Sequence, residues 1–138
     1  MRSITWDFWN PTAVIQMAQQ KALDRMDEVC DMLLAKIKAK MNESKSGREY
    51  YIKGLGKHIA SAPGESPARQ FDILYNALTK KVWVYRGTVM GAVGVNLDSD
   101  NPGYAIYLEM GTEKMKPRPY LRNTLFESES EIKRIFGI

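Results

Sequence analysis

Apolar residues recur at helical spacing through the first third of the chain. From Pro11 to Met41 they follow one another at steps of three, four and seven residues, and the acidic residues fall largely on the opposite face. Asn10 is a favoured N-cap, and proline is tolerated at the first helical position because its missing N–H would have no partner there. The pattern predicts one helix from about Pro11 to Met41, about 45 Å long. Its apolar stripe consists of Ile15, Ala22, Met26, Val29, Leu33 and Ile37.

The middle of the chain changes from helical spacing to a pattern typical of strands. The run "KVWVY" is β-branched and aromatic, and "TVMGAVGVN" alternates valine with small residues. Arg86 and Gly87 stand between the two runs, so we expect a β-hairpin that turns at this pair. Gly91 and Gly94 within the second run indicate bulges or close backbone approaches.

Shorter elements complete the predicted fold. "FDILYNAL" fits one or two helical turns, and "YAIYLEMGT" fits either a short helix or a bent strand. Pro119 is the expected first residue of a closing amphipathic helix that ends at about Phe136. The fold class predicted for the single domain, 1–138, is α+β: a long N-terminal helix, an extended Pro/Gly-rich loop or arm, a small antiparallel β-sheet and a closing C-terminal helix.

Two segments fall outside this pattern. Residues 42–69 show little periodicity and include "PGESP", whose prolines exclude a helix or a central strand, so we expect an extended loop. Tyr50 and Tyr51 make this loop too apolar for simple disorder, and we expect it to become ordered against a partner. Residues 1–10 form a predicted N-terminal arm, in which Ile4, Trp6 and Phe8 alternate with polar residues.

Composition bounds the setting. The 138 residues are 44% hydrophobic and 26% charged, as in an ordinary globular domain. The single cysteine, Cys30, cannot form an internal disulfide, which favours a reducing compartment. No run approaches the roughly 18 apolar residues of a membrane span. The start of the chain lacks the apolar core of a signal peptide, so we expect synthesis in the cytosol and no membrane partner.

The net charge of +4 is unevenly distributed. Residues 36–57 carry seven basic and two acidic side chains, a sum of +5, and the rest of the chain sums to −1. Such a basic block can meet phosphate or an acidic protein face. A solvated helix end and loop would explain the same residues. The candidate contacts to DNA or to an acidic partner are Lys36, Lys40, Lys45, Lys53 and Lys57.

The sequence offers little for catalysis. One histidine, His58, and one cysteine cannot supply a zinc site, and no nucleophile or phosphate-loop motif is present. Glu109 and Glu113 could act as acid and base, although exposed or ion-paired carboxylates are commoner. We therefore expect no catalytic, metal or cofactor site and no enzyme activity. A basic nucleic-acid-binding module acting alone remains the alternative of a different class.

Four ordered motifs resemble one known family. They are "SGREY" at 46–50, "ASAPGESP" at 60–67, "YAIYLEMGT" at 104–112 and "RPYLR" at 118–122. Together they resemble the neck, or tail-completion, family of long-tailed bacteriophages, the minor tail components of lambdoid type. The resemblance covers roughly residues 12–136. This chain departs from the family pattern at 70–74, where the family usually has a Thr-Gly-x-Leu turn.

The resemblance implies a structural protein of the virion, assembled in the bacterial host cytoplasm. It implies a ring of copies of the chain, expected to be hexameric, that completes the tail and joins it to the filled head. The implied partners are the head-closure or connector protein and the tail terminator or tail tube protein. Genomic DNA would pass through the lumen without sequence reading. A nucleic-acid-binding module acting outside the virion is the competing interpretation.

The motifs supply the candidate site residues. We hypothesise that the segment from Tyr50 to Pro67 is an arm that becomes fixed on a neighbouring subunit, because prolines lower the entropy cost of ordering a loop. In the later motifs, Gly111 is expected at positive φ and Arg118 is expected to pair with Glu109. The interface candidates are Arg48, Tyr50, Tyr51, Ser61, Pro63, Gly64, Glu65 and Pro67. The architectural candidates are Tyr104, Tyr107, Glu109, Gly111, Thr112, Arg118 and Pro119.

Overall fold

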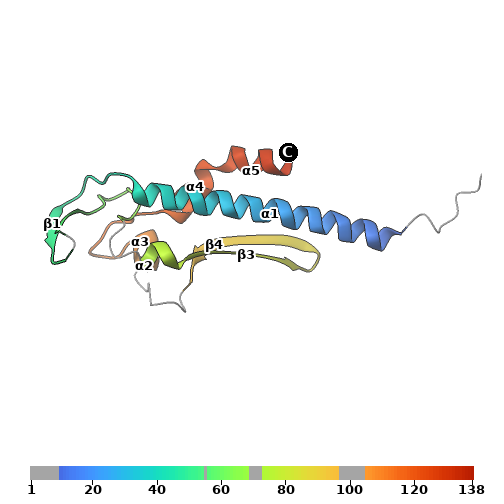
Figure 1. The fold of residues 1–138 in the computed structure, drawn as a ribbon, viewed down its shortest axis with the longest axis horizontal. Coiled ribbons are helices and arrows are strands. Elements are labelled where there is room, and N and C mark those ends of the chain that lie inside the picture. The colour runs from blue at the N-terminus through green and yellow to red at the C-terminus, as the bar shows by residue number, and fades with distance from the viewer. Residues whose placement is uncertain (1–9, 55, 69–72, 97–104) are drawn as a thin grey trace, which may run out of the picture.

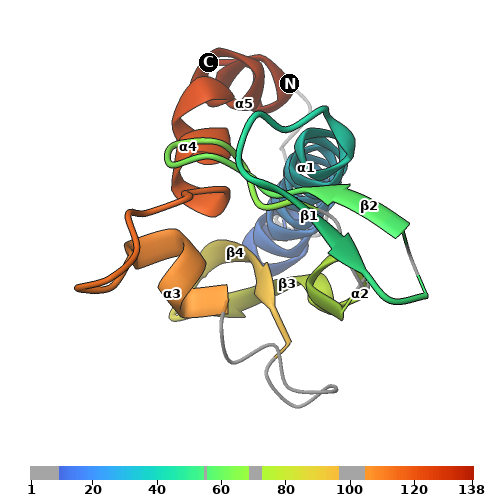
Figure 2. The ribbon, with the colours of Figure 1, turned by 90° about the vertical axis from the view of Figure 1, so that its left-hand side faces the viewer.

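The computed structural model describes residues 10–54, 56–68, 73–96 and 105–138. One long helix runs the length of the molecule, with a β-hairpin along one side and two short helices along another (Figures 1 and 2). The fold is α+β, as the sequence predicts. In chain order the elements are α1 Pro11–Asn42, β1 Glu49–Ile52, β2 Gly56–Ile59, α2 Ile73–Ala77, β3 Leu78–Tyr85, β4 Thr88–Val95, α3 Ala105–Met110, α4 Leu121–Glu127 and α5 Glu129–Phe136.

The predicted long helix is confirmed as α1, which begins at Pro11 and ends at Asn42. The Asn10 side chain accepts a hydrogen bond of 3.1 Å from the Ala13 amide, as expected of an N-cap. Its apolar stripe is buried only in the second half of the helix, from Val29 onward. The first turns carry exposed apolar side chains instead, those of Val14, Ile15 and Met17.

The predicted hairpin is confirmed as β3 and β4, which pair in antiparallel register and both pack along α1. Arg86 and Gly87 both adopt positive φ, 49° and 77°, which fits the tight turn that strand twist favours. Gly91 lies against α1: a Cβ there would come within 2.6 Å of Met26. The close approach predicted for Gly91 is therefore confirmed, whereas that for Gly94 is wrong, because no heavy atom lies within 4 Å of its built Cβ.

The sequence predicts one extended loop over 42–69, and this prediction is wrong. Within this segment β1 and β2 form a second, separate two-stranded hairpin, with Tyr50 opposite His58. Glycines at positive φ, Gly54 and Gly56, bracket its turn and let two strands of four residues pair. We call residues 49–59 the hairpin arm.

The closing helix differs from the prediction at both its start and its middle. It begins at Leu121 rather than Pro119, and it divides at Ser128 into α4 and α5. Ser128 is fully buried, and its backbone, at φ −98° and ψ 5°, leaves the helical range between the two segments. The stretch that fitted a helix or a strand is helix α3, and Ile73–Ala77 confirms a short helix in the described part of 71–78.

Two apolar clusters hold these elements on α1. One lies at the C-terminal half of the helix and joins it to α2, β3, α3 and the start of α4; its buried members are Ile37, Met41, Leu74, Leu78, Ala105 and Tyr120. The other joins the middle of α1 to α5 through Val29, Leu33 and Ile135. Over the described ranges, no helix combines the length and apolar character needed to cross a membrane.

Candidate interaction site at the junction of four motifs

The four motifs, far apart in the sequence, are linked by hydrogen bonds at one end of the molecule. Their described residues lie beside the C-terminal end of α1, where the hairpin arm, α3 and the start of α4 meet (Figure 2). We call this set of residues, 46–47, 60–65, 108–112 and 117–122, the motif junction.

The Glu65 carboxylate closes the base of the hairpin arm. It accepts hydrogen bonds from the Ser46 hydroxyl, from the Ser46 amide at 3.2 Å and from the Ala62 amide at 2.8 Å. These donors, the Ser46 hydroxyl foremost, lower the pKa of Glu65 to about 2. The ionised side chain therefore links the first motif to the second.

The Pro-Gly pair forms a tight turn. The Glu65 amide donates to the Ala62 carbonyl at 3.1 Å, and Gly64 lies at φ 88°, the arrangement of a type II turn with proline at its second position. The Gly64 amide in turn donates to the Pro117 carbonyl at 3.1 Å. The stiff stretch thus serves as a bracket between the arm and the loop before α4.

Gly47 precedes β1 and lies directly against the backbone that follows β2. Its amide donates to the Ala60 carbonyl at 2.9 Å, and the Ala60 amide donates to the Arg48 carbonyl at 3.0 Å. A Cβ at Gly47 would lie 2.8 Å from the backbone carbonyl carbon of Ser61 and closer still to the Ala60 oxygen. Only glycine fits at this position without a backbone shift.

Arg118 does not pair with Glu109, so that expectation is wrong. Its Nε donates to the Ser61 carbonyl at 3.0 Å, and its amide donates to the Leu108 carbonyl at 2.6 Å. The side chain extends toward the Pro-Gly turn, where the Ser61 carbonyl accepts its hydrogen bond. Arg118 therefore joins the fourth motif to the second.

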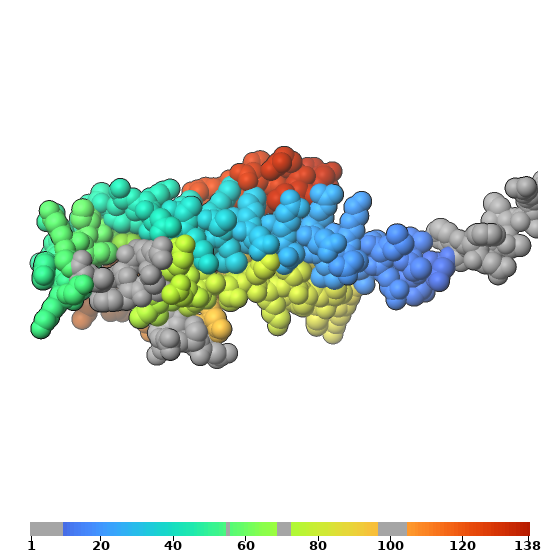
Figure 3. All heavy atoms as spheres, viewed as in Figure 1, coloured from blue at the N-terminus to red at the C-terminus, as the bar shows by residue number. Residues whose placement is uncertain are grey.

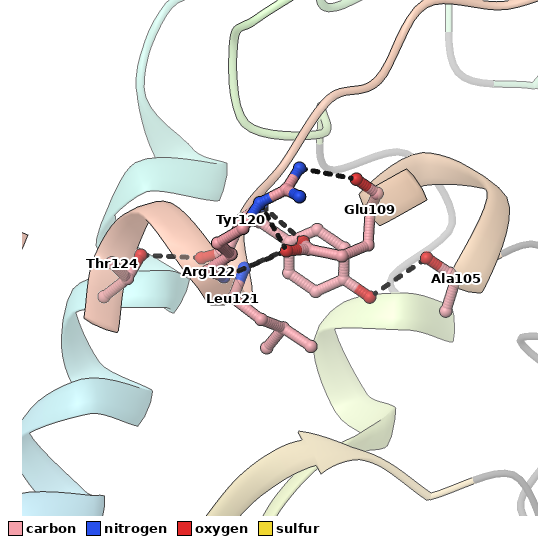
Figure 4. Close-up of polar contacts among 6 residues, drawn as sticks. All are labelled: Ala105, Glu109, Tyr120, Leu121, Arg122 and Thr124. Atoms are coloured by element: carbon pink, nitrogen blue, oxygen red, sulfur yellow. Dashed lines mark hydrogen bonds and ion pairs between the residues drawn. The ribbon is translucent and has the colours of Figure 1, made fainter. Parts of the chain in front are cut away.

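Glu109 caps the start of α4 (Figure 4). One carboxylate oxygen accepts from the amides of Tyr120 at 2.8 Å and Leu121 at 3.0 Å, and the other accepts from the Arg122 amide at 2.9 Å. The Arg122 guanidinium lies 4.0 Å from the carboxylate and also donates to the Glu109 carbonyl at 3.4 Å. The first amides of a helix have no acceptors within the helix, and here the Glu109 carboxylate accepts from them. This cap explains why α4 begins at this point.

Tyr120 anchors this cap in the core. Its side chain is 1% exposed, and its hydroxyl donates to the Ala105 carbonyl at 3.3 Å (Figure 4). The buried Thr124 hydroxyl donates back to the Tyr120 carbonyl at 2.6 Å. The fourth motif is therefore held from both the α3 and the α4 side.

The loop before α4 contains the predicted positive-φ glycine. Gly111 lies at φ 79°, and its amide donates to the Tyr107 carbonyl at 2.7 Å, which ends α3. Thr112 and Met115 then exchange backbone hydrogen bonds in a tight turn. Tyr107 is exposed on α3, and Tyr104 lies outside the described residues.

The predicted interface residues divide between two places. Arg48, Tyr50 and Tyr51 belong to the arm or its base, and the Tyr51 side chain is 78% exposed. The Tyr50 ring meets His58 edge to face, with ring centres 5.2 Å apart. The second motif lies in the junction rather than on the arm: Ser61 and Pro67 are buried, Pro63 and Gly64 are exposed, and Glu65 is half-buried.

The hairpin arm forms one end of the molecule, left in Figure 3, and the first turns of α1 lie at the other end of the described chain. Among the elements described, β1 and β2 pack extensively only on each other. Since an isolated two-stranded hairpin is marginally stable in water, the hydrogen bonds at the base of this arm matter for its stability.

Two lysines of the basic block join α1 to the closing helices. Lys36 Nζ lies 2.6 Å from Glu131 Oε1, and Lys40 pairs with Glu127. The hydrogen bond from Lys36 lowers the pKa of the Glu131 carboxyl. Part of the predicted basic surface is therefore matched within the chain.

The other three candidate lysines lie on or near the arm. Lys57 Nζ lies 3.0 Å from Glu49 Oε1 across the hairpin, and Lys53 lies in the hairpin turn. Lys45 Nζ donates to the Lys40 carbonyl at 2.7 Å, and desolvation lowers its pKa. Four of the five candidate lysines, all but Lys53, therefore contact an acceptor within the described part of the same chain.

Gly47 and Arg122 belong to the junction but are not among the predicted site residues, although both lie within the motifs. Their roles depend on the backbone atoms of distant segments, which a motif does not reveal. In the part of the chain that the structure describes, no three His, Cys, Asp or Glu side chains gather to hold a metal ion. Cys30 is buried against β4, and burial raises the pKa of its thiol.

Comparison of the chain with models of protein families, with curated proteins and with solved structures finds no match.

Proposed function

We propose that this chain is a structural protein of the bacteriophage neck, which forms a ring that completes the tail and joins it to the DNA-filled head. The observation that carries the proposal is the motif junction. Four motifs that resemble one family in sequence meet in a hydrogen-bonded unit, and this unit supports an arm that packs on no other described element extensively. The role involves no bond making or breaking.

The arm supplies the first contact surface. Tyr51 projects from β1, and Ile59 at the end of β2 is also exposed. Tyrosine contributes large contact area at low entropy cost and is enriched in interfaces. The Glu65 and Gly47 contacts fix the base of the arm, so docking does not have to order it from a free loop.

The opposite end supplies the second surface. Val14, Ile15 and Met17 are exposed on the first turns of α1, and Met17 is 73% exposed. An elongated subunit with unlike contact surfaces at its two ends suits a head-to-tail interface, which closes into a ring when its rotation closes. The partners in this proposal are neighbouring copies of the chain and the adjoining proteins of the neck, on the head side and on the tail side.

Two measurements test the proposed function. Mass photometry of the purified chain is expected to show a ring-sized species, and Tyr51→Ser is expected to shift it toward the monomer. Tyr85→Ser, at an exposed tyrosine away from the arm, is the matched control and is expected to leave the mass unchanged. A chain that stays monomeric at every concentration contradicts the ring.

The second measurement is electron microscopy of a phage that encodes the chain, with and without its gene. Loss of the gene is expected to leave filled heads and separate tails. Normal particles in its absence contradict the proposal and favour the nucleic-acid-binding alternative. That alternative further requires that the purified monomer bind DNA with a steep salt dependence.

A further inference from the structure

An apolar groove lies between α1, β4 and the closing helices. Its volume is about 560 Å³, within the range of sites that hold a ligand or a few large side chains. Its walls are largely aliphatic and aromatic, and its one charged pair, Glu109 with Arg122, is matched within the chain. The residues that line it include Met26, Gly91, Ala92, Val93, Leu125 and Phe136.

The groove reaches β4 at the edge of the strand. Gly91, Ala92 and Val93 all line it, and side chains of consecutive strand residues point to opposite faces, so the edge itself forms the wall. Among the described strands β4 pairs only with β3. An apolar groove beside such an edge can accept an added strand, with backbone hydrogen bonds on one side and apolar side chains in the groove.

The sequence outside the described residues contains a segment of this type. In "MRSITWDFW", Ile4, Trp6 and Phe8 alternate with Ser3, Thr5 and Asp7. As a strand, this segment would present two aromatic rings and an isoleucine on one face and polar side chains on the other. That is the pattern that the groove and the β4 edge would select.

The same chain cannot place Trp6 and Phe8 of this segment in its own groove. Met26, the groove residue of α1 nearest the N-terminus, lies sixteen residues after Asn10, about 24 Å along the helix. Trp6 stands only four residues before Asn10, a reach of about 14 Å even when fully extended. A segment folded back along its own α1 would therefore leave Trp6 about 10 Å short of the groove.

We propose that the N-terminal segment 3–9 of a second copy docks in this groove and adds a strand to β4. The exposed apolar side chains of Val14, Ile15 and Met17 continue from the segment and would be covered at the same contact. The inference rests on the proposed ring, to which it adds one contact beside that of the hairpin arm: the start of one subunit enters the groove of the next. Glu109 and Arg122 stay paired in the groove, because the apolar face of the incoming segment adds no charged side chain.

Mixed-chain cross-linking tests the inference. One full chain carries Phe8→Cys and a second carries Leu125→Cys, and the two are mixed and oxidised. The expected result is a disulfide-linked pair of the two chains. Phe126→Cys replaces Leu125→Cys in the matched control, because Phe126 is also exposed, at 69% against 48%, but does not line the groove. Absence of a link at Leu125, or an equal yield at Phe126, overturns the inference.

Mass photometry separates this inference from the proposed function. Trp6→Ser is expected to weaken association about tenfold or more, while Thr5→Ala on the polar face leaves it unchanged. If rings form and no link at Leu125 is found, the groove contact is wrong and the ring proposal stands. If the unmodified chain stays monomeric, the ring and the groove contact both fail.

Discussion

The Glu109 carboxylate supports the start of α4 through three backbone amides. Glu109→Ala removes every one of these acceptors at once from a largely buried position, so we expect a loss of about 2 kcal/mol in the free energy of unfolding. Urea unfolding followed by circular dichroism measures it. Glu113→Ala, an exposed carboxylate in the next loop, is the control and should change stability by less than about 0.5 kcal/mol. Equal effects of the two variants would show that the cap is unimportant.

Glu65 makes the base of the arm sensitive to acid. Its pKa is lowered from an ordinary 4.5 to about 2, so its stabilising contribution is complete above pH 4.5 and is lost as the pH falls through 2. A carbon-13 NMR titration of the Glu65 carboxyl is expected to show a midpoint near 2. Over the same range the Ser46 and Ala62 amide signals should shift. A midpoint near 4.5 would mean that the hydrogen bonds to Ser46 and Ala62 do not form in solution.

The sequence predicted the residues of the junction better than their partners. The motifs contain Glu109 and Arg118, but Glu109 accepts mainly from backbone amides and Arg118 donates to a backbone carbonyl. Every residue type carries a backbone carbonyl and every one but proline a backbone N–H, so a sequence pattern does not reveal which of these groups will be close. The simplest expectation was an ion pair between these two oppositely charged residues. Instead, each side chain hydrogen-bonds backbone groups that would otherwise lack a partner.

At the scale of elements, Gly47 decides whether the hairpin arm can close at its base. Gly47→Ala places a Cβ against the backbone of Ala60 and Ser61, so we expect a loss of about 2 kcal/mol or a displaced arm. Gly94→Ala is the matched control, because the space around it is open and its φ is not positive. It should be neutral or slightly stabilising. Urea midpoints of the two variants give the comparison, and similar midpoints would contradict the close packing at Gly47.

The arm should also differ from the rest of the fold in its local stability. Because β1 and β2 pack extensively only on each other within the part of the chain that the structure describes, their amides are expected to exchange with solvent much faster than those of β3 and β4 in the monomer. Assembly should then protect them. Hydrogen exchange with mass spectrometry can follow both states. Full protection of residues 49–59 in the isolated monomer would remove the argument that this arm awaits a partner.

Long periodic elements were predictable, and short ones were not. Helix α1 and the β3–β4 hairpin follow from many side chains that repeat one pattern. The hairpin arm has two strands of four residues with mostly exposed side chains, so its pairing leaves almost no hydrophobic alternation. The break at Ser128 likewise depends on packing around one buried residue rather than on a breaker residue.

At the scale of the molecule, the two ends of the described chain differ. The arm and the motif junction lie at one end, and the exposed apolar turns of α1 lie toward the other (Figure 1). Lysines that looked like a DNA-binding block pair partly with Glu131 and Glu127 inside the chain. These two ion pairs reduce the basic charge that the proposed DNA-binding alternative would have available.

The most direct measurement locates the chain in a finished particle. The C-terminal Ile138 is exposed, so a gold-binding tag can follow it without disturbing the buried contacts of α5. Electron microscopy of infectious particles that carry the tagged chain is expected to show label between the head and the tail. Particles that are infectious and contain no copy of the chain would contradict the account.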